Sequence, residues 1–383
     1  MVIWTKRTAL LVLAMVLPAA ACSAAAPFGE QAANREVIDD PGQPGARPLA
    51  GEAAEQRPII DAVKAAIARR DYAALNAMES EFRTTRSRTS SGIWKLSVFH
   101  WRVLAELGPK NGQCDDRSAD FFKGWMAATP GQPAPYITRA AVLEDDAWCL
   151  RGDGVASTVT ALAFGSFAAK VDEAAKVLTD HRAIAAIDPH YYAVMERIYI
   201  DQGAAKADFK RLLEEGTARE PDYHYLYFDA YRYYQPQWYG SDAEIDELAR
   251  FAAARSASAE GLGMYARYYW FATDCKCSIQ NSIDWPTMKA AMRDVMDRYP
   301  SDWNAANFAR ISCDMRDYEE AGTWLNRVKK DYSDAWSDKV EMRRCEAMSQ
   351  VQKSTVHSAE RCPYAAIEMW PRADFEKYCR PPG

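Results

Sequence analysis

The sequence has few of the features on which nucleic-acid-binding and polytopic membrane proteins depend. Its 383 residues include no lysine- or arginine-rich run, and the formal net charge is -6. Because phosphate binding needs a basic face, these values argue against a nucleic-acid partner. Beyond the N-terminus no apolar run approaches the roughly 20 residues that a transmembrane helix needs, so no further spanning segment is predicted.

Sequence motifs of nucleotide, metal and hydrolytic sites are also missing. The chain contains no G-x-G-x-x-G, P-loop, G-x-S-x-G or H-E-x-x-H pattern. The loop "RGDGVAS" (151 to 157) is a poor phosphate cradle, because the Asp153 carboxylate would repel an anion, and it is expected to start a helix. The five histidines never stand four residues apart: they are His100, His181, His190, His224 and His357. We therefore expect no metal, no cofactor and no catalytic residue.

Two polar features need a structural interpretation. Glu144, Asp145 and Asp146 are adjacent, and neighbouring residues on a helix point in different directions, so they are expected to form a solvated face rather than an acid–base pair. His190 follows Pro189 at the start of a predicted helix, which favours a capping or surface role over catalysis.

The first 21 residues are typical of an export signal. Lys6 and Arg7 precede a short apolar stretch from 9 to 21, which ends in "LPAAAC" at Cys22. This pattern resembles the lipobox of bacterial lipoproteins, although Ala19 stands where leucine is more common. The resemblance implies cleavage before Cys22, a lipid on that cysteine as the only membrane contact, and a place on the periplasmic side of the outer membrane. The alternative is ordinary secretory cleavage, which would give a soluble periplasmic or secreted protein.

Residues 22–56 are rich in Ala, Gly, Pro and Glu and contain almost no large apolar side chains. Such a segment buries too little surface to offset its ordering entropy. It is predicted to be a disordered tether between the signal peptide and the folded part.

The nine cysteines fit an oxidising compartment. Without Cys22 an even number remains, which indicates disulfides. The expected bridges are Cys114–Cys149, which flanks one predicted helical hairpin, and Cys362–Cys379, which would close the tail. The other four are expected to staple neighbouring repeats: they are Cys275, Cys277, Cys313 and Cys345. The closeness of Cys275 and Cys277 would also suit a soft metal or a redox pair, but no second pair with matching spacing accompanies them.

Residues 57–352 read as helical hairpins. Ile59, Ile60, Val63 and Ile67 lie on one helical face, Pro58 suits a first helical position, and Asp71 can cap the next helix. The tripeptide "RDY" marks a turn at 70 to 72 and again at 316 to 318, and Ser301 or Asp302 can cap the helix before the second of these turns. The pairs at 57–82, 188–221 and 299–328 resemble degenerate tetratricopeptide repeats, in which stacking of neighbours makes a continuous core. The fold class predicted is all-α, a stack of tetratricopeptide-like helical hairpins, followed by a cysteine-containing tail at 353–383.

The segment from 221 to 240, "PDYHYLYFDAYRYYQPQWYG", carries aromatic rings on every side of a helix. A helix that is apolar all round is usually buried, so core packing is the first interpretation. Ser241 and Glu244 form a predicted capping box for the helix that follows. The functional alternative is an aromatic-lined surface for a peptide or a sugar, with four candidate contacts: Tyr233, Tyr234, Trp238 and Tyr239.

Residues from about 120 to 330 resemble an uncharacterised bacterial domain family of unknown function. The segment with Ala147, Trp148, Arg151 and Gly152 matches one of its motifs, and the segment with Pro236, Trp238, Gly240 and Ser241 matches another. The chain departs from the family after Pro130, where a serine is expected. The resemblance implies a tetratricopeptide-like helical domain and supplies no catalytic residues.

These observations predict an exported, lipid-anchored helical-repeat scaffold that binds protein or peptide partners, with no enzymatic activity. An enzyme or binding protein acting on cell-wall or other glycans is the alternative, and a structural envelope component without a discrete ligand is a third. Convergent carboxylates or a carboxylate–histidine pair in a pocket would identify an enzyme.

Overall fold

The protein is all-helical in the computed structural model, which describes residues 51–110, 112–152, 154–274, 282–329, 335–336 and 339–353. No strand occurs among these residues, which contain two isolated β-bridges. The α-helices are α2 (Gly51–Ala68), α3 (Tyr72–Thr85), α4 (Lys95–Leu107), α5 (Ala119–Ala128), α6 (Ala134–Arg151), α7 (Ala161–Asp180), α8 (Arg182–Ala185), α9 (His190–Asp201), α10 (Lys206–Arg219), α11 (Tyr225–Tyr234), α12 (Asp242–Glu260), α13 (Gly263–Asp274), α14 (Trp285–Arg298), α15 (Asp302–Asp314), α16 (Tyr318–Leu325) and α17 (Lys339–Lys353).

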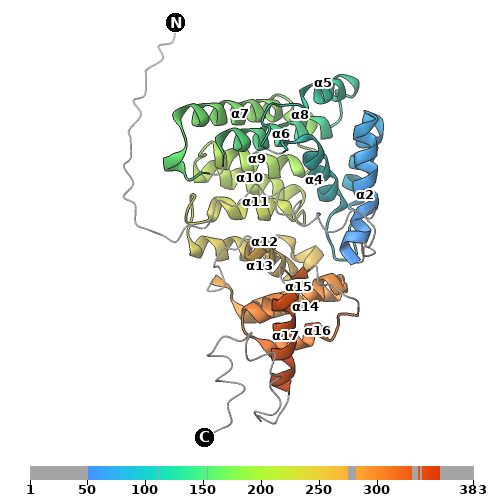
Figure 1. Ribbon diagram of the computed structural model, residues 1–383, viewed down its shortest axis with the longest axis vertical. Coiled ribbons are helices and arrows are strands. Elements are labelled where there is room, and N and C mark those ends of the chain that lie inside the picture. Colours follow the sequence, from blue (N-terminus) through green and yellow to red (C-terminus); the bar gives the residue numbers. More distant parts are fainter. Residues whose placement is uncertain are drawn as a thin grey trace.

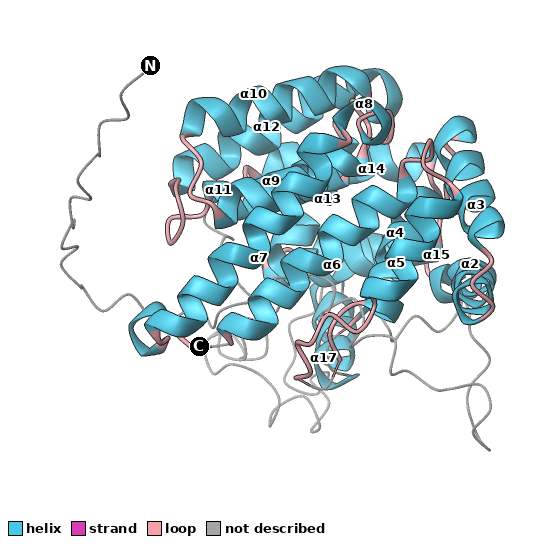
Figure 2. Ribbon diagram, turned by 90° about the horizontal axis from the view of Figure 1, so that it is seen from above, coloured by secondary structure: helices cyan, strands magenta, loops and turns pink. Residues whose placement is uncertain are grey.

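The helices form a two-layered stack that follows the chain from α6 to α17 (Figure 1). The first layer contains α6, α9, α11, α13 and α15, and each helix packs on the next one in this layer. The second layer contains α7, α10, α12, α14 and α16, and Figure 2 shows α10 and α12 beside α9 and α11. Helix α2 does not extend the stack at its end but packs against both α4 and α15. The predicted stack of helical hairpins is therefore confirmed.

The two RDY turns have the same structure. Arg70 and Arg316 adopt the left-handed conformation, with φ of 52° and 59°. The next residue caps the following helix: Asp71 accepts from the Ala74 N–H at 3.0 Å, and Asp317 accepts from the Glu320 N–H at 3.0 Å. An arginine that ends one helix and an aspartate that starts the next make a tight connection between antiparallel helices.

Two predicted helix starts are also confirmed, and one differs in detail. The Ser301 hydroxyl accepts from the Asn304 N–H at 3.2 Å, and the Ser241 hydroxyl accepts from the Glu244 N–H at 3.4 Å. In the second case the Glu244 carboxylate accepts from the Ser241 hydroxyl at 3.0 Å rather than from its backbone N–H. The Ser241 hydroxyl therefore makes both bonds of the capping box, one with the backbone and one with the side chain of Glu244.

The folded part begins earlier than the sequence pattern indicates. Helix α2 starts at Gly51 and not at residue 57, and Pro58 lies inside it rather than at its first position. The polar residues of its first turns are held by tertiary contacts: Glu52 is buried and accepts from the Ser91 hydroxyl at 2.5 Å, and Glu55 accepts from the Ser90 N–H at 2.7 Å. A composition that looks like a tether is helical here because its carboxylates have partners elsewhere in the chain.

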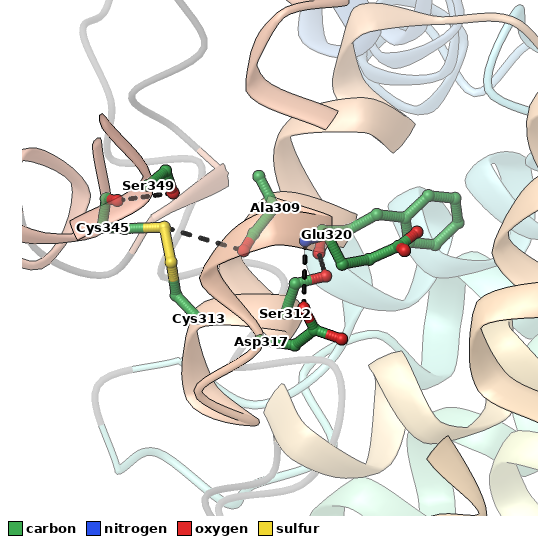
Figure 3. Close-up of a disulfide and its surroundings, with 8 residues drawn as sticks. Ala309, Ser312, Cys313, Asp317, Glu320, Cys345 and Ser349 are labelled. Atoms are coloured by element: carbon green, nitrogen blue, oxygen red, sulfur yellow. Dashed lines mark hydrogen bonds between the residues drawn. A yellow bond between two sulfur atoms is a disulfide. The ribbon is translucent and has the colours of Figure 1, made fainter. Parts of the chain in front are cut away.

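One disulfide ties a loop to a helix, and a second one joins two helices. Cys114 is bonded to Cys149 at the end of α6, as expected, with a Cα–Cα distance of 5.6 Å. Cys313 is bonded to Cys345, so α17 is tied to the end of α15 (Figure 3). The remaining cysteines lie outside the described residues: they are Cys22, Cys275, Cys277, Cys362 and Cys379.

Candidate interaction surface

A short hairpin between α3 and α4 reaches across the stack. Arg88 and Trp94 form an antiparallel bridge, the Thr89 N–H donates to the Ile93 carbonyl at 2.9 Å, and the Gly92 N–H donates to the Thr89 carbonyl at 3.0 Å. We call residues 87–94 the crossing hairpin. Besides its bonds to α2, it contacts the N-terminal ends of α11, α13 and α15 and the C-terminal end of α12, which follow it by more than a hundred residues.

Glu260 is the centre of the contacts that hold this hairpin. Its fully buried carboxylate accepts from Arg88 at 2.9 Å and from Arg267 at 2.7 Å, and lies 2.7 Å from His224 Nε2. Burial by itself would raise the pKa of Glu260, but Arg267, His224 and Arg88 outweigh it and hold this pKa well below its usual range. Arg88 also pairs with Asp222 at 2.6 Å. The result is a largely buried ionic network that joins the crossing hairpin to the start of α11, the end of α12 and α13.

The tip of the crossing hairpin is held by hydrogen bonds to its backbone. The Ser91 carbonyl accepts from Arg267 at 2.9 Å and from the Asn304 amide at 3.0 Å. Gly92 has φ of +92°, and a Cβ there would lie 2.3 Å from the Arg267 guanidinium. The position therefore requires glycine both for its backbone conformation and for the close approach. The crossing hairpin consequently covers the N-terminal ends of the first-layer helices α11, α13 and α15.

A second buried polar cluster lies beside the crossing hairpin. His100 Nε2 is 2.7 Å from the Asp188 carboxylate, and the His190 ring stacks on His100 and lies 2.9 Å from the Tyr223 hydroxyl. The expected surface role of His190 is wrong: the residue is buried because Asp188 accepts from its N–H and the two imidazoles pack together. Burial is also the main reason that the pKa of Glu79, near Asp188, rises to about 8. A carboxylate–imidazole pair is common in hydrolytic sites, but His100 and Asp188 have no exposed side-chain surface and so are not accessible to a substrate.

The middle of the first layer carries half-buried aromatic rings. Phe228 of α11 stacks on Phe271 of α13 with ring centroids 4.4 Å apart, and Tyr225 lies 5.8 Å from Phe228. Trp270 continues the row to Trp303 of α15 at 6.3 Å. These five rings, which we call the aromatic row, belong to three helices that are distant in sequence.

The C-terminal ends of α6 and α11 meet in a cluster of tryptophan and arginine. The Arg232 guanidinium lies 4.7 Å from the Trp148 ring centre and 4.6 Å from that of Trp238, and Arg151 lies 5.0 Å from Trp148. The Asp201 carboxylate fixes the geometry, because it accepts from the Trp148 indole at 3.0 Å and from Arg232 at 3.3 Å. We call Trp148, Arg151, Arg232 and Trp238 the Trp–Arg cluster. All four are partly exposed.

The four predicted contact residues have different positions. Tyr233 and Tyr234 are 1% and 9% exposed, so their prediction as contacts is corrected. Tyr233 stacks on Phe209 at 3.9 Å and donates to the Ala204 carbonyl, so it packs α11 on α10. Trp238 belongs to the Trp–Arg cluster. Tyr239 is 38% exposed and donates to the Ile200 carbonyl at 2.9 Å.

The acidic run on α6 is not a solvated face. Glu144 and Asp146 are buried, and Glu144 and Asp145 both pair with Arg197 of α9, which is 2.9 Å from Asp145. Adjacent residues converge on one guanidinium here because Arg197 reaches between them from the neighbouring helix. The prediction of a solvated face is wrong because it was based on α6 alone, without the neighbouring helix α9.

Buried carboxylates lie behind the Trp–Arg cluster. Burial raises the pKa of Asp229 to about 7, although Arg197 and Arg232 favour its charged form. Glu196 is buried with no hydrogen-bond partner at either side-chain oxygen, and its pKa is raised by burial and by the nearby Asp229. A protonated Glu196 is the state that such surroundings favour.

Sequence reasoning missed most of this surface. Trp148 and Arg151 were recognised only as part of a family-like motif, yet the structure brings this motif together with the one that contains Trp238, with the two tryptophans 6.2 Å apart. Tyr225 and Phe228 stood in the aromatic segment, but no pattern in it distinguished their half-buried positions. Phe271, Trp270 and Trp303 gave no local signal, because only packing places them in one row.

A shallow cavity of about 440 Å³ lies elsewhere, between α3 and the turn before α6. Asn76, Ser80, Thr129 and Gln132 give it a polar lining without a titratable group. Within the described ranges, no group of histidine, cysteine, aspartate and glutamate is arranged to hold a metal ion, and no helix is long and apolar enough to cross a membrane.

Comparisons with known proteins do not assign the chain to a family. No family model, no curated protein and no solved structure matches it significantly.

Proposed function

We propose that this protein is an exported helical-repeat scaffold that binds a peptide segment of a protein partner in the bacterial envelope. The carrying observation is the assembly of partly exposed rings and guanidinium groups from α6, α11, α13 and α15 into the aromatic row and the Trp–Arg cluster. Aromatic and arginine side chains held rigidly in this way are the usual anchors of protein interfaces. No ordering of these side chains is needed when a partner binds, which favours affinity.

The chemistry of the surface indicates the kind of segment that it takes. Arg151 and Arg232 offer guanidinium groups next to apolar rings, which suits a segment with aromatic or aliphatic side chains and a carboxylate. The glycan alternative is less well supported, because a sugar stacks on an open aromatic face. Guanidinium groups of the protein already lie over the rings of Trp148 and Trp238.

Export and anchoring are part of the proposal. The signal-like N-terminus and its lipobox-like end at Cys22 support them, as do two disulfides, which persist in oxidising compartments. Intact mass of the protein isolated from cells, before and after reduction, tests the lipid on Cys22 and counts the bridges.

A displayed library of random peptides tests the binding surface. Peptides enriched on the purified wild type are expected to bind the Trp238→Ala and Phe228→Ala variants at least about tenfold more weakly, since each substitution removes an anchor ring. Phe251→Ala is the matched control, because Phe251 is a half-buried ring of the second layer. The proposal fails if no peptide is enriched, or if the enriched peptides bind all three variants as they bind wild type.

A further inference from the structure

One edge of the molecule exposes an apolar segment without any charge. The fifteen residues from Val155 to Ala169 include no Asp, Glu, Lys, Arg or His. Three large apolar side chains in it face solvent: Val155 is 57% exposed, Leu162 is 81% exposed and Phe164 is 39% exposed. Single exposed apolar residues are normal on protein surfaces, but a contiguous and uncharged group of them marks a contact site.

The segment is presented on a rigid base. It forms the turn from α6 to α7 and the first turns of α7, at the side edge of the stack (Figure 1). The Thr160 hydroxyl caps α7 by accepting from the Ala163 N–H at 3.2 Å, and Phe167 packs edge-on to Trp148 at 5.1 Å. The buried face of α7 is therefore fixed against α6, and Leu162 and Phe164 remain outside it.

Cationic and tryptophan side chains lie beside the segment, together with acidic residues in the flanking sequence. Arg151 stands before it, with its guanidinium 5.7 Å from the Phe164 ring, and Lys170, which is paired with two carboxylates, directly follows it. Trp148 and Trp238 are connected to the same edge through the Trp–Arg cluster. An uncharged apolar tip with arginine, lysine and tryptophan behind it matches the acyl region and the headgroup level of a bilayer.

We infer that residues 155–169 dock on the surface of a lipid bilayer, as a second membrane contact besides the proposed lipid on Cys22. The inference rests on the anchoring part of the proposed function and not on the peptide-binding part. Residues 23–50 separate Cys22 from the first described residue, and a stretch of that length spans at most about 100 Å. The anchor would therefore keep the segment at a high local concentration near the membrane, where a weak insertion suffices.

Vesicle flotation of the exported chain, from residue 22 and with Cys22→Ser to remove the lipid, tests the inference. Vesicles of phosphatidylethanolamine and phosphatidylglycerol are the probe. Wild-type residues 155–169 are expected to bring the protein to the vesicle fraction, and a Leu162→Glu, Phe164→Glu double variant is expected to partition at least about tenfold less. Ile187→Glu is the matched control, because Ile187 is 51% exposed but lies outside the segment, and it should float like the parent.

Three results would overturn the inference. The first is that the parent protein does not float, and the second is that the double variant floats equally well. The third is that the parent sediments as a dimer and the double variant as a monomer, which would make the segment an interface between copies of this chain. Peptide binding of the double variant is measured in parallel. Retained peptide binding with lost flotation, or the reverse, separates the failure of one proposal from that of the other.

Discussion

The two ends of α11 are built from the same residue types and have opposite properties. At its N-terminal end, arginine, histidine and aromatic side chains surround Glu260 and hold the crossing hairpin in a largely buried network. At its C-terminal end, Arg232 lies between Trp148 and Trp238, which are partly exposed. The difference is whether another part of the chain covers the rings and guanidinium groups. Where the hairpin covers them they stabilise the fold, and where nothing among the described residues covers them they are available for binding.

The two ends also contain carboxylates with opposite pKa shifts. Glu260 is within hydrogen-bonding distance of two arginines and a histidine, and its pKa is lowered despite burial. Asp229 is buried behind the Trp–Arg cluster, and its pKa is raised because desolvation outweighs Arg197 and Arg232. Burial is similar in the two cases, so the number of direct cationic partners decides the direction of the shift.

Substitution of Glu260, at the covered N-terminal end of α11, has the largest expected effect on stability. The Glu260→Gln variant leaves the buried Arg267 without the charge of Glu260, while Arg88 keeps its pair with Asp222, and this lowers the free energy of unfolding by about 3–5 kcal/mol. Denaturation by urea with the disulfides intact measures this. Glu319→Gln, on the exposed face of α16, is the control and should change stability by less than about 0.5 kcal/mol. Equal stability of Glu260→Gln and wild type would show that the network does not stabilise the packing of the crossing hairpin on the stack.

Gly92→Ala tests the crossing hairpin itself. Alanine at this position would have to adopt φ of +92°, and its Cβ would displace the Arg267 guanidinium. The free energy of unfolding should therefore fall by about 2–3 kcal/mol. Gly165→Ala provides the contrast, because Gly165 lies in α7 with no atom within 4 Å of an added Cβ, and alanine there should add up to about 1 kcal/mol. Urea midpoints of the two variants should therefore move in opposite directions.

The pH dependence of stability tests the C-terminal end of α11 and gives the smallest change per measured step, which here is one pH unit. A folded-state pKa of about 7 for Asp229, above the usual value near 4, means that the folded protein binds more protons than the unfolded chain in this window. Wild type should thus lose stability as pH rises from about 4 to about 7, by at most about 1.4 kcal/mol per pH unit from this group. Asp229→Asn should lack this part of the loss.

Stability of wild type minus that of Asp229→Asn gives the contribution of Asp229 together with the part of the Glu196 titration that depends on Asp229. Glu79, whose pKa is raised to about 8, contributes equally to both proteins and cancels in the difference. A difference that stays constant from pH 4 to pH 8 would contradict the assignment.

Local patterns in the sequence predicted the elements of the fold well. The RDY turns, the caps at Asp71, Ser241 and Ser301 and the helical periodicity depend on residues a few positions apart, so they could be recognised without knowledge of the packing. The start of α2 was missed because Glu52 and Glu55 are held by Ser90 and Ser91. The buried state of His190 was missed because its partner His100 is on α4.

The sequence by itself determined an all-helical chain of capped hairpins, since each amphipathic helix and each turn is specified by neighbouring residues. Tertiary structure alone decided which aromatic rings are buried and which are open. Tyr233 and Trp238 stand in one aromatic run, yet one packs on Phe209 and the other stays partly exposed next to Arg232. The reason is that exposure depends on what a helix packs against, and the packing partners here are contributed by segments far away in the chain.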